Sequence, residues 1–137
     1  MMKLMKLWLL IVCSFISLTA LSQKKEDITG NWKVIRVLLP AELKGDKQGI
    51  QKMEKIMLQT SFHFNSDGSC TVNSPEKEMQ FKKCKWTFNN KEKSISINGE
   101  VNGEKGLLMI IIVSLKNNKW YFELVETTVT LEVQRTG

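Results

Sequence analysis

Two cysteines, Cys70 and Cys84, carry the most defined chemistry that this sequence offers outside its N-terminal segment. A symmetric loop around Lys77 would place their side chains directly opposite each other on neighbouring strands, as a cross-strand disulfide requires. Zinc binding is disfavoured, because the spacing lacks close Cys-x-x-Cys pairs and the sole histidine, His63, does not complete a four-ligand set. We expect a Cys70–Cys84 disulfide, with two free core thiols as the alternative.

Catalysis has little material in the rest of the chain. The sequence has one histidine, no Ser–His–Asp set that predicted strands would bring together, and no glycine-rich phosphate loop before a helix. Glu100 and Glu104 flank a predicted turn, where solvated carboxylates are ordinary. We therefore expect no enzyme activity, no metal and no cofactor.

Residues 1–22 have the pattern of an export signal. Lys3 and Lys6 precede an apolar run that ends in small and polar residues, and cleavage is predicted after Ser22. The run is shorter than the roughly 20 apolar residues of a spanning helix, so an uncleaved anchor is the less favoured alternative. We expect residues 23–137 to form one exported domain, periplasmic or secreted, with no membrane span.

The charge pattern argues against a nucleic-acid partner. The formal net charge is +6, and removal of residues 1–22 takes away two lysines and no acidic residue, which leaves +4. The remaining basic residues are scattered along the chain and glutamate usually accompanies them. Nucleic-acid binding needs a continuous cationic surface, so we expect no nucleic-acid partner.

The elements that must position these residues are strands. From Ser61 onward, apolar runs alternate with turn signals such as "SDG", "NNK" and "KNNK" at intervals of about ten residues, which is typical of an antiparallel meander or barrel. We predict an all-β fold: an eight-stranded antiparallel up-and-down barrel with one short helix between its first two strands. The predicted strands are residues 30–39, 60–65, 69–74, 79–88, 93–101, 107–115, 119–126 and 127–135, and the helix is 47–59.

The predicted hairpins share one apolar face, because side chains alternate between faces along a strand. The predicted opposite pairs are Phe64–Cys70, Phe62–Val72, Trp86–Ile95, Cys84–Ile97, Leu115–Trp120, Val113–Phe122, Ile111–Leu124, Leu124–Val129, Phe122–Leu131 and Trp120–Val133. A bulge near Phe81 would reconcile this apolar pattern with Cys70 opposite Cys84.

The helical stretch has one apolar stripe, formed by Ile50, Met53, Ile56 and Met57. We expect the helix to pack on the barrel, with a mobile lid as the alternative. The predicted strand 107–115 is apolar on both faces, so its outer side needs a cover. The helix is the first candidate for this cover, and a second copy of the chain, in a homodimer through this strand, is the other.

The start and the end of the predicted barrel carry a family resemblance. Gly30-Asn31-Trp32 opens the first strand and Arg135 lies at the end of the last, a pattern that resembles the lipocalins. In that family the Trp of a Gly-x-Trp motif plugs the closed end of the barrel, and an Arg from the last strand packs over its indole. The resemblance implies that Gly30, Trp32 and Arg135 close one end of this barrel.

The motifs "GNWKV", "FHFNSDGS", "CKWTF", "SISI" and "TVTLEV" are similar to those of the short lipocalin-like domains exported by Bacteroidetes, over nearly all of residues 23–137. Most of these motifs are folding signals, so the resemblance implies the barrel more than its ligand. The chain lacks the Thr-Asp-Tyr motif of true lipocalins and is short for that family. These departures weigh against a deep, calyx-type ligand site.

The predicted inner face supplies an aromatic candidate site. An eight-stranded barrel is just wide enough either to be filled by side chains or to hold one small molecule. The inward rings would stabilise the fold by burial in either case. The candidate ligand-binding residues of this set are Phe62, Phe64, Trp86, Trp120 and Phe122.

Arg36 shares the inward parity of Trp32 on the first strand. An unpaired guanidinium inside an apolar barrel is costly, so two arrangements are open. Near the open end, Arg36 could hold a ligand carboxylate in a bidentate pair. A bulge would instead turn it to solvent and bring Ile35, Val37 and Leu39 into the inner row, and this is the favoured arrangement.

These patterns together predict an exported, non-catalytic binding protein for a small apolar or amphipathic molecule held in or at the mouth of a β-barrel. The alternative is a protein-interaction or structural module with a side-chain-filled barrel and no small ligand.

Overall fold

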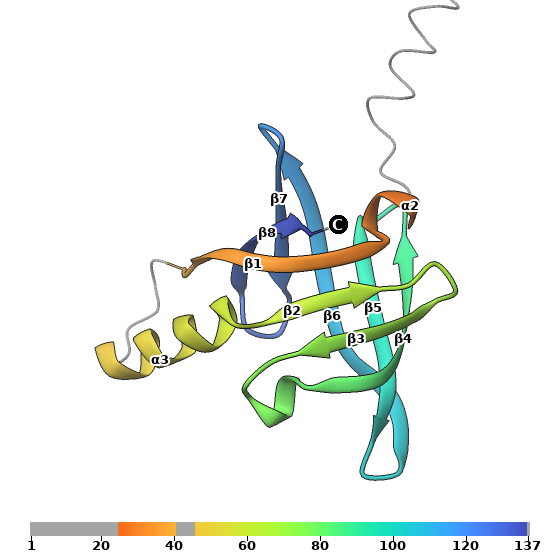
Figure 1. Cartoon of the computed structure of the whole chain (residues 1–137), viewed down its shortest axis with the longest axis horizontal. Helices are drawn as coiled ribbons and strands as arrows, with labels where there is room; N and C mark the ends of the chain where they lie inside the picture. The colour runs from red at the N-terminus through yellow and green to blue at the C-terminus, as the bar shows by residue number, and fades with distance from the viewer. Residues whose placement is uncertain (1–24, 41–45, 137) are drawn as a thin grey trace, which may run out of the picture.

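Eight antiparallel strands close into a barrel (Figure 1). The structure is a computed structural model and describes residues 25–40 and 46–136. Each strand pairs with the next along the chain, and β8 pairs with β1, which confirms the predicted fold class. The strands are β1 (Gly30–Leu38), β2 (Ser61–Phe64), β3 (Ser69–Asn73), β4 (Phe81–Asn89), β5 (Ser94–Val101), β6 (Glu104–Lys116), β7 (Lys119–Leu124) and β8 (Val129–Arg135).

Helical segments lie before β1, between β1 and β2, and between β3 and β4. They are α2 (Lys25–Ile28), α3 (Lys47–Leu58) and the 3-10 turn η1 (Lys77–Met79), so the predicted helix between the first two strands is confirmed. The predicted signal at residues 1–22 lies outside the described residues. Within those residues, no helix is long and apolar enough to cross a membrane.

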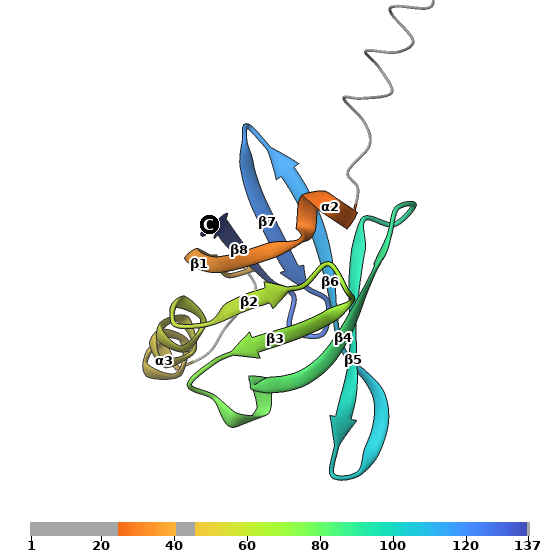
Figure 2. The same cartoon turned by 45° about the vertical axis from the view of Figure 1, so that its right-hand side comes forward.

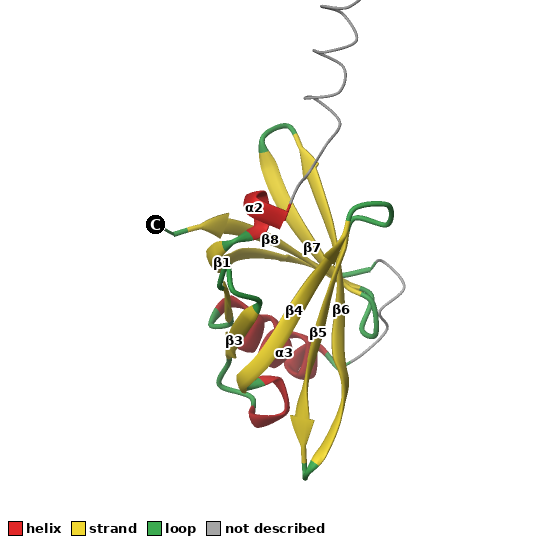
Figure 3. Ribbon diagram, turned by 90° about the vertical axis from the view of Figure 1, so that its right-hand side faces the viewer, coloured by secondary structure: helices red, strands yellow, loops and turns green. Residues whose placement is uncertain are grey.

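The barrel has two different ends (Figures 1 and 2). The closed end carries α2, the C-terminus and the turns that join β2 to β3, β4 to β5 and β6 to β7. The mouth end carries α3, η1 and the turns that join β5 to β6 and β7 to β8. At the mouth end the β5–β6 hairpin projects beyond the other strands, next to η1 (Figure 3).

The register of three hairpins follows the prediction. The β2–β3, β6–β7 and β7–β8 pairs are all as expected. In the β6–β7 hairpin, Asn117 and Asn118 both have positive φ angles, of 52° and 63°, which a two-residue hairpin turn favours. These pairs direct one apolar face into the barrel, except at the end of the β6–β7 hairpin, where Leu115 is 43% exposed.

The β4–β5 hairpin differs from the prediction by two residues. Trp86 lies opposite Ile97 instead of Ile95, and Cys84 shifts likewise. The turn is longer than predicted because the side-chain oxygen of Asn89 accepts hydrogen bonds from two backbone N–H groups of the turn, at 3.0 and 3.2 Å. A shift of two residues keeps each side chain on its predicted face, so the composition of the core is unchanged.

Three β-bulges re-aim side chains in the half of the barrel nearest the mouth. A bulge sets two residues of one strand against one of its partner. The bulge in the β3–β4 pair places Val72 opposite Phe81, which is the arrangement that the sequence left open. The register shifts lie between Val34 and Arg36 on β1, between Cys70 and Val72 in the β3–β4 pair, and between Ile97 and Asn98 in the β5–β6 pair.

Helix α3 packs against β1 at the mouth end. Asp46 caps its start, since a side-chain oxygen accepts the N–H of Gln48 at 3.3 Å. Met57 is buried and Met53 packs against the core, as the predicted apolar stripe requires. On the outer face of β6, Ile112 is 39% exposed, so α3 does not provide the cover that was predicted for that face. A helical period identifies an apolar stripe but not the surface against which the stripe packs.

Candidate functional site

The predicted ligand-binding aromatic residues meet inside the barrel and pack against one another. Phe62, Phe64, Trp86 and Phe122 are at most 1% exposed. The ring centres of Phe64 and Trp86 are 5.1 Å apart, and those of Phe62 and Phe122 are 5.6 Å apart in an edge-on contact. Such contacts stabilise a core beyond the area that they bury. These rings fill the half of the barrel nearest the closed end.

The closed end has the arrangement that the lipocalin resemblance implies. The Trp32 indole is 1% exposed, and its Nε1 donates to the carbonyl oxygen of Ile28 at 2.7 Å. The Arg135 guanidinium lies 4.9 Å from the centre of the same ring, and Trp120 contacts it edge-on at 5.3 Å. Gly30 has a φ of 134°, which residues with a side chain rarely adopt, so a larger residue would be strained there although a Cβ would only be in ordinary contact with Arg135.

A second indole lies under a second cation at this end. Trp86 Nε1 donates to the carbonyl oxygen of Asn65 at 2.8 Å, and Lys25 Nζ lies 5.2 Å from the centre of the ring. Lys25 belongs to α2, a short helix that the sequence did not predict. The two cation–π contacts are therefore made by α2, which precedes β1, and by the last residue of β8, and they hold both segments against the barrel.

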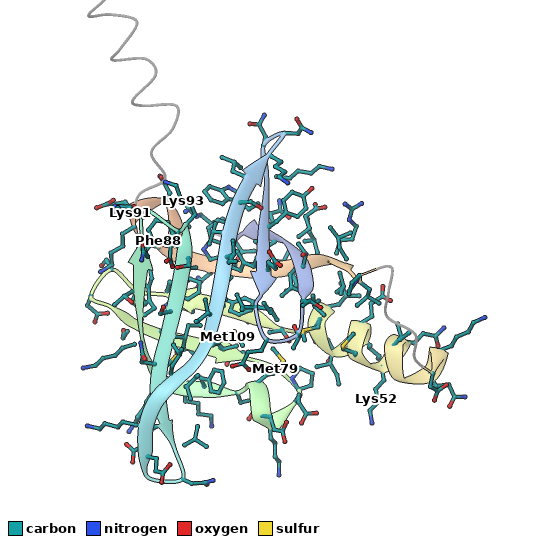
Figure 4. All side chains as sticks on the ribbon, turned by 180° about the vertical axis from the view of Figure 1, so that it is seen from behind. Lys52, Met79, Phe88, Lys91, Lys93 and Met109 are labelled. Atoms are coloured by element: carbon teal, nitrogen blue, oxygen red, sulfur yellow. The ribbon has the colours of Figure 1, made fainter. Side chains whose placement is uncertain are left out.

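The mouth end has a different lining. Every residue of this lining is either buried itself or packs against the buried core. Methionine side chains are prominent in it, and they adapt to different partners because they are unbranched and polarisable. Figure 4 shows Met79 and Met109 away from Lys91 and Lys93, which lie at the closed end. The lining comprises Met53, Met57, Met79, Met109, Val37, Leu39, Phe81 and Leu108.

A groove of about 770 Å³ opens beside the mouth and is lined by residues of η1, the start of β4 and the β5–β6 hairpin. Phe81, Val101 and Leu108 form its apolar wall. Phe81 and Leu108 also pack against the buried core, so the groove and the mouth lining share these two side chains. The other groove residues are Lys77, Glu78, Gln80, Lys82, Lys83, Glu100, Asn102 and Gly103.

Leu108 reaches this position because of the third bulge, which adds one residue to β6 opposite Ile97 and Asn98. A Cβ on Gly99 would lie 2.6 Å from Leu108 Cδ1, so the leucine occupies the space that the glycine leaves open. The same Cβ would lie 3.5 Å from Cys84 Cβ. Leu108 and Cys84 therefore both lie beside the open space at Gly99, and Leu108 also lines the groove.

Arg36 points out of the barrel. Its side chain is 56% exposed, and its Nε lies 3.2 Å from Glu132 Oε1. The first bulge brings Val37 and Leu39 against the core, as the favoured arrangement predicted, but Ile35 is 42% exposed instead of inward. Arg36 does not line the barrel interior, which removes the geometry that its predicted anion-binding role there required.

Cys70 and Cys84 lie directly opposite each other, as predicted. Both are buried free thiols, and Cys84 Sγ donates to the carbonyl oxygen of Cys70 at 3.0 Å. The neighbouring Cys84 sulfur, and after it burial, raise the pKa of the Cys70 thiol, so this thiol stays protonated at neutral pH. The predicted register is confirmed, whereas the disulfide itself is not formed here and stays a prediction.

His63 lies on β2 between Asn31 and Thr71, beside a polar hollow of about 370 Å³. It has no partners of the kind that hold a metal ion. In residues 25–40 and 46–136, His, Cys, Asp and Glu side chains form no group of three or more that could hold one.

Sequence reasoning missed the groove and the gathering of methionines at one end. The groove depends on two bulges and on a projecting hairpin, and strand periodicity does not show these features. The consecutive pair Lys82 and Lys83 beside Phe81, together with the glycines at 99 and 106, was the available signal.

Comparison with known proteins does not indicate a function for the chain. No family model matches the chain, and no curated protein matches it. A similar solved structure is the crystal structure of a DUF4847 family protein from Bacteroides vulgatus, with a TM-score of 0.47 and 12% sequence identity. The match covers 80% of this chain and 95% of that chain. At this TM-score the likeness carries no argument about what the chain does.

Proposed function

We propose that the chain is an exported, non-catalytic binding protein that holds a small apolar or amphipathic molecule at the mouth end of its barrel. The observation that carries this proposal is the contrast between the two ends. Packed rings fill the closed half, whereas methionines and a groove lie at the other end. A ligand site at the mouth therefore fits the geometry better than one among the aromatic residues.

The mouth end has the features of a small-molecule site. Such sites usually have volumes of about 300–1,000 Å³, apolar walls and a few polar groups. The groove, at about 770 Å³, lies within this range and has both kinds of lining. Three separate elements contribute methionines to the neighbouring apolar surface: Met53 and Met57 from α3, Met79 from η1 and Met109 from β6.

Two parts of the proposal rest on sequence patterns. The signal pattern of residues 1–22 supports export to the periplasm or out of the cell. The sequence motifs described above, together with the strand pairing and cation–π contact between Trp32 and Arg135, support a relation to the short lipocalin-like domains exported by Bacteroidetes.

Native mass spectrometry of the protein purified from its own host tests the proposal. The spectrum is recorded before and after mild organic extraction. A discrete mass that disappears on extraction supports a carried molecule and gives its class. A bare chain at its calculated mass in both spectra, from several growth conditions, contradicts the proposal.

A second candidate function is a protein-interaction module with a filled barrel. The exposed outer face of β6 favours it, since Ile112 is 39% exposed and Ile110 next to it is half-buried. A homodimer through β6 would cover this face. Sedimentation equilibrium tests it: a concentration-dependent dimer that Ile112→Glu abolishes would favour this candidate, and a monomer at all concentrations would count against it.

A further inference from the structure

We propose that the groove between η1 and the β5–β6 hairpin selects the anionic head group of a free amphipathic ligand, whose apolar part lies on Phe81 and Leu108. This inference rests on the proposed function and deepens it, because it names the chemical class of the ligand. It depends on how the second bulge places lysines, on the charge balance of the groove and on the size of the groove.

The second bulge brings two consecutive lysines to one rim. In a regular strand, neighbours such as Lys82 and Lys83 point to opposite faces of the sheet. Here Cys84 pairs with Cys70 and Phe81 pairs with Val72, so both lysines stand against one residue of β3. Both line the same groove, together with Lys77 from η1. Three ammonium groups therefore surround one hollow.

The charge balance around the groove is positive. A smaller hollow on the outer face of β4, β5 and β6 shares Lys83 and Glu100 with the groove and adds Lys85 and Lys105. The two hollows together have five lysines and two glutamates, the second glutamate being Glu78. Among the described residues, none of these lysines forms an ion pair with a carboxylate. An anion would give these ammonium groups a partner.

The apolar wall and the size of the groove define the rest of the ligand. Phe81 and Leu108 continue from the groove into the mouth lining, so a chain that starts among the lysines can lie along apolar side chains. A volume of about 770 Å³ suits one small molecule. A carboxylate on a medium-length aliphatic chain, as a free monomer, has this combination of charge and shape.

Calorimetric titration with a set of twelve-carbon probes tests the inference. The probes are dodecanoate, dodecylphosphocholine and dodecyltrimethylammonium, each below its micellar concentration, so that only the head group differs. Lys82→Gln/Lys83→Gln removes the rim charge. Lys91→Gln/Lys93→Gln is the matched control, since these lysines lie in the β4–β5 turn at the closed end (Figure 4).

We expect the unchanged protein to bind dodecanoate at least about tenfold more tightly than dodecyltrimethylammonium, because the lysines attract an anionic head group and repel a cationic one. The rim variant should lose about tenfold in dodecanoate affinity and none for the cationic probe. The control variant should stay within about twofold of the unchanged protein for every probe, since its charges lie at the other end.

Two failures are distinguishable in this experiment. If all three probes bind with similar affinity, head-group selection is overturned and the proposed function stands. If no probe binds, the inference fails, and native mass spectrometry of the host-purified protein decides separately whether the proposed function fails with it. A third arm uses vesicles of phosphatidylcholine with one quarter phosphatidylglycerol: cosedimentation that the rim variant abolishes would replace the free ligand by a membrane surface and overturn the inference.

Discussion

Tryptophan and methionine side chains lie at opposite ends of the barrel. After residue 22, all three tryptophans lie at the closed end and all four methionines lie at the mouth. At the closed end, Trp32 and Trp86 each have a hydrogen-bonded indole and a cation over the ring. At the mouth, bulges break the strand pattern and flexible side chains line the surface. The closed end is therefore held by directional contacts of its indoles, whereas the mouth end is packed with unbranched, adaptable side chains.

The largest expected effect is at the closed end. Trp32→Ala should lower the free energy of unfolding by about 3–5 kcal/mol, because it removes a buried indole together with its hydrogen bond and its cation contact. Chemical denaturation of the two proteins measures this difference. A loss below about 1 kcal/mol would mean that the indole is not a structural plug.

Oxidation of the cysteine pair should have the next largest effect on the free energy of unfolding. Under a disulfide oxidant such as oxidised glutathione, Cys70 and Cys84 should lose two hydrogens and form one bridge, because their strands pair at these residues. The bridge should raise the free energy of unfolding by about 3 kcal/mol, through the loop that it closes in the unfolded chain. Intact mass and denaturation are the measurements.

The control for this prediction is Cys70→Ser/Cys84→Ser, whose mass and stability should not respond to the oxidant. If the native protein keeps both thiols under conditions that oxidise the unfolded chain, the opposed register does not lead to a bridge.

At the mouth, a buried methionine should matter less than the indole. Met57→Ala should cost about 2 kcal/mol of unfolding free energy, since Met57 is 4% exposed and packs α3 on the core. Met57→Leu, which conserves volume, should cost less than about 1.5 kcal/mol. Thermal or urea denaturation of both variants compares them. A cost for Met57→Ala equal to that of Trp32→Ala would remove the contrast between the two ends.

The smallest effect concerns the β2–β3 turn at the closed end. The Ser69 hydroxyl, which donates to Asp67 at 2.6 Å, and then the Ser69 N–H hold the pKa of the Asp67 carboxyl below its usual 3.8. Because the pKa of Asp67 is lower in the folded than in the unfolded chain, its hydrogen bonds stabilise the fold at pH values above the unfolded-state pKa. This stabilisation is lost as the pH falls through the folded-state pKa. Ser69→Ala should move the Asp67 pKa back toward 3.8 in an NMR titration. An unchanged pKa would show that the hydroxyl is not the main cause.

Short-range patterns predicted most of the fold. The predicted turn at Asn117 and Asn118 gave three cross-strand pairs correctly, because a two-residue turn with positive φ at both positions fixes the register of the two strands that it joins. The β4–β5 register was missed because the Asn89 side chain lengthens its turn, and composition does not show that hydrogen bond. The prediction that α3 covers the outer face of β6 was wrong for a similar reason: an apolar stripe on a helix does not show which strand the helix packs against.

The candidate site was less predictable than the fold. Phe62 and Trp86 were placed on the correct face, but whether rings enclose space or fill it depends on their exact packing. The groove depends on Leu108 lying over Gly99, which follows from a bulge that strand periodicity conceals. Alternation of apolar residues identifies the inner face, whereas bulges decide what the mouth presents.

The proposed function places the ligand at the mouth end and not among the rings of the closed end. NMR spectra of protein with ¹³C-labelled methionine methyl groups and ¹⁵N-labelled tryptophan indoles, titrated with dodecanoate, distinguish these two locations. We expect the methyl signals of Met53, Met57, Met79 and Met109 to shift while the indole signals of Trp32, Trp86 and Trp120 stay in place. Shifted indoles with unmoved methionines would locate the ligand among the aromatic residues and rule out a site at the mouth end.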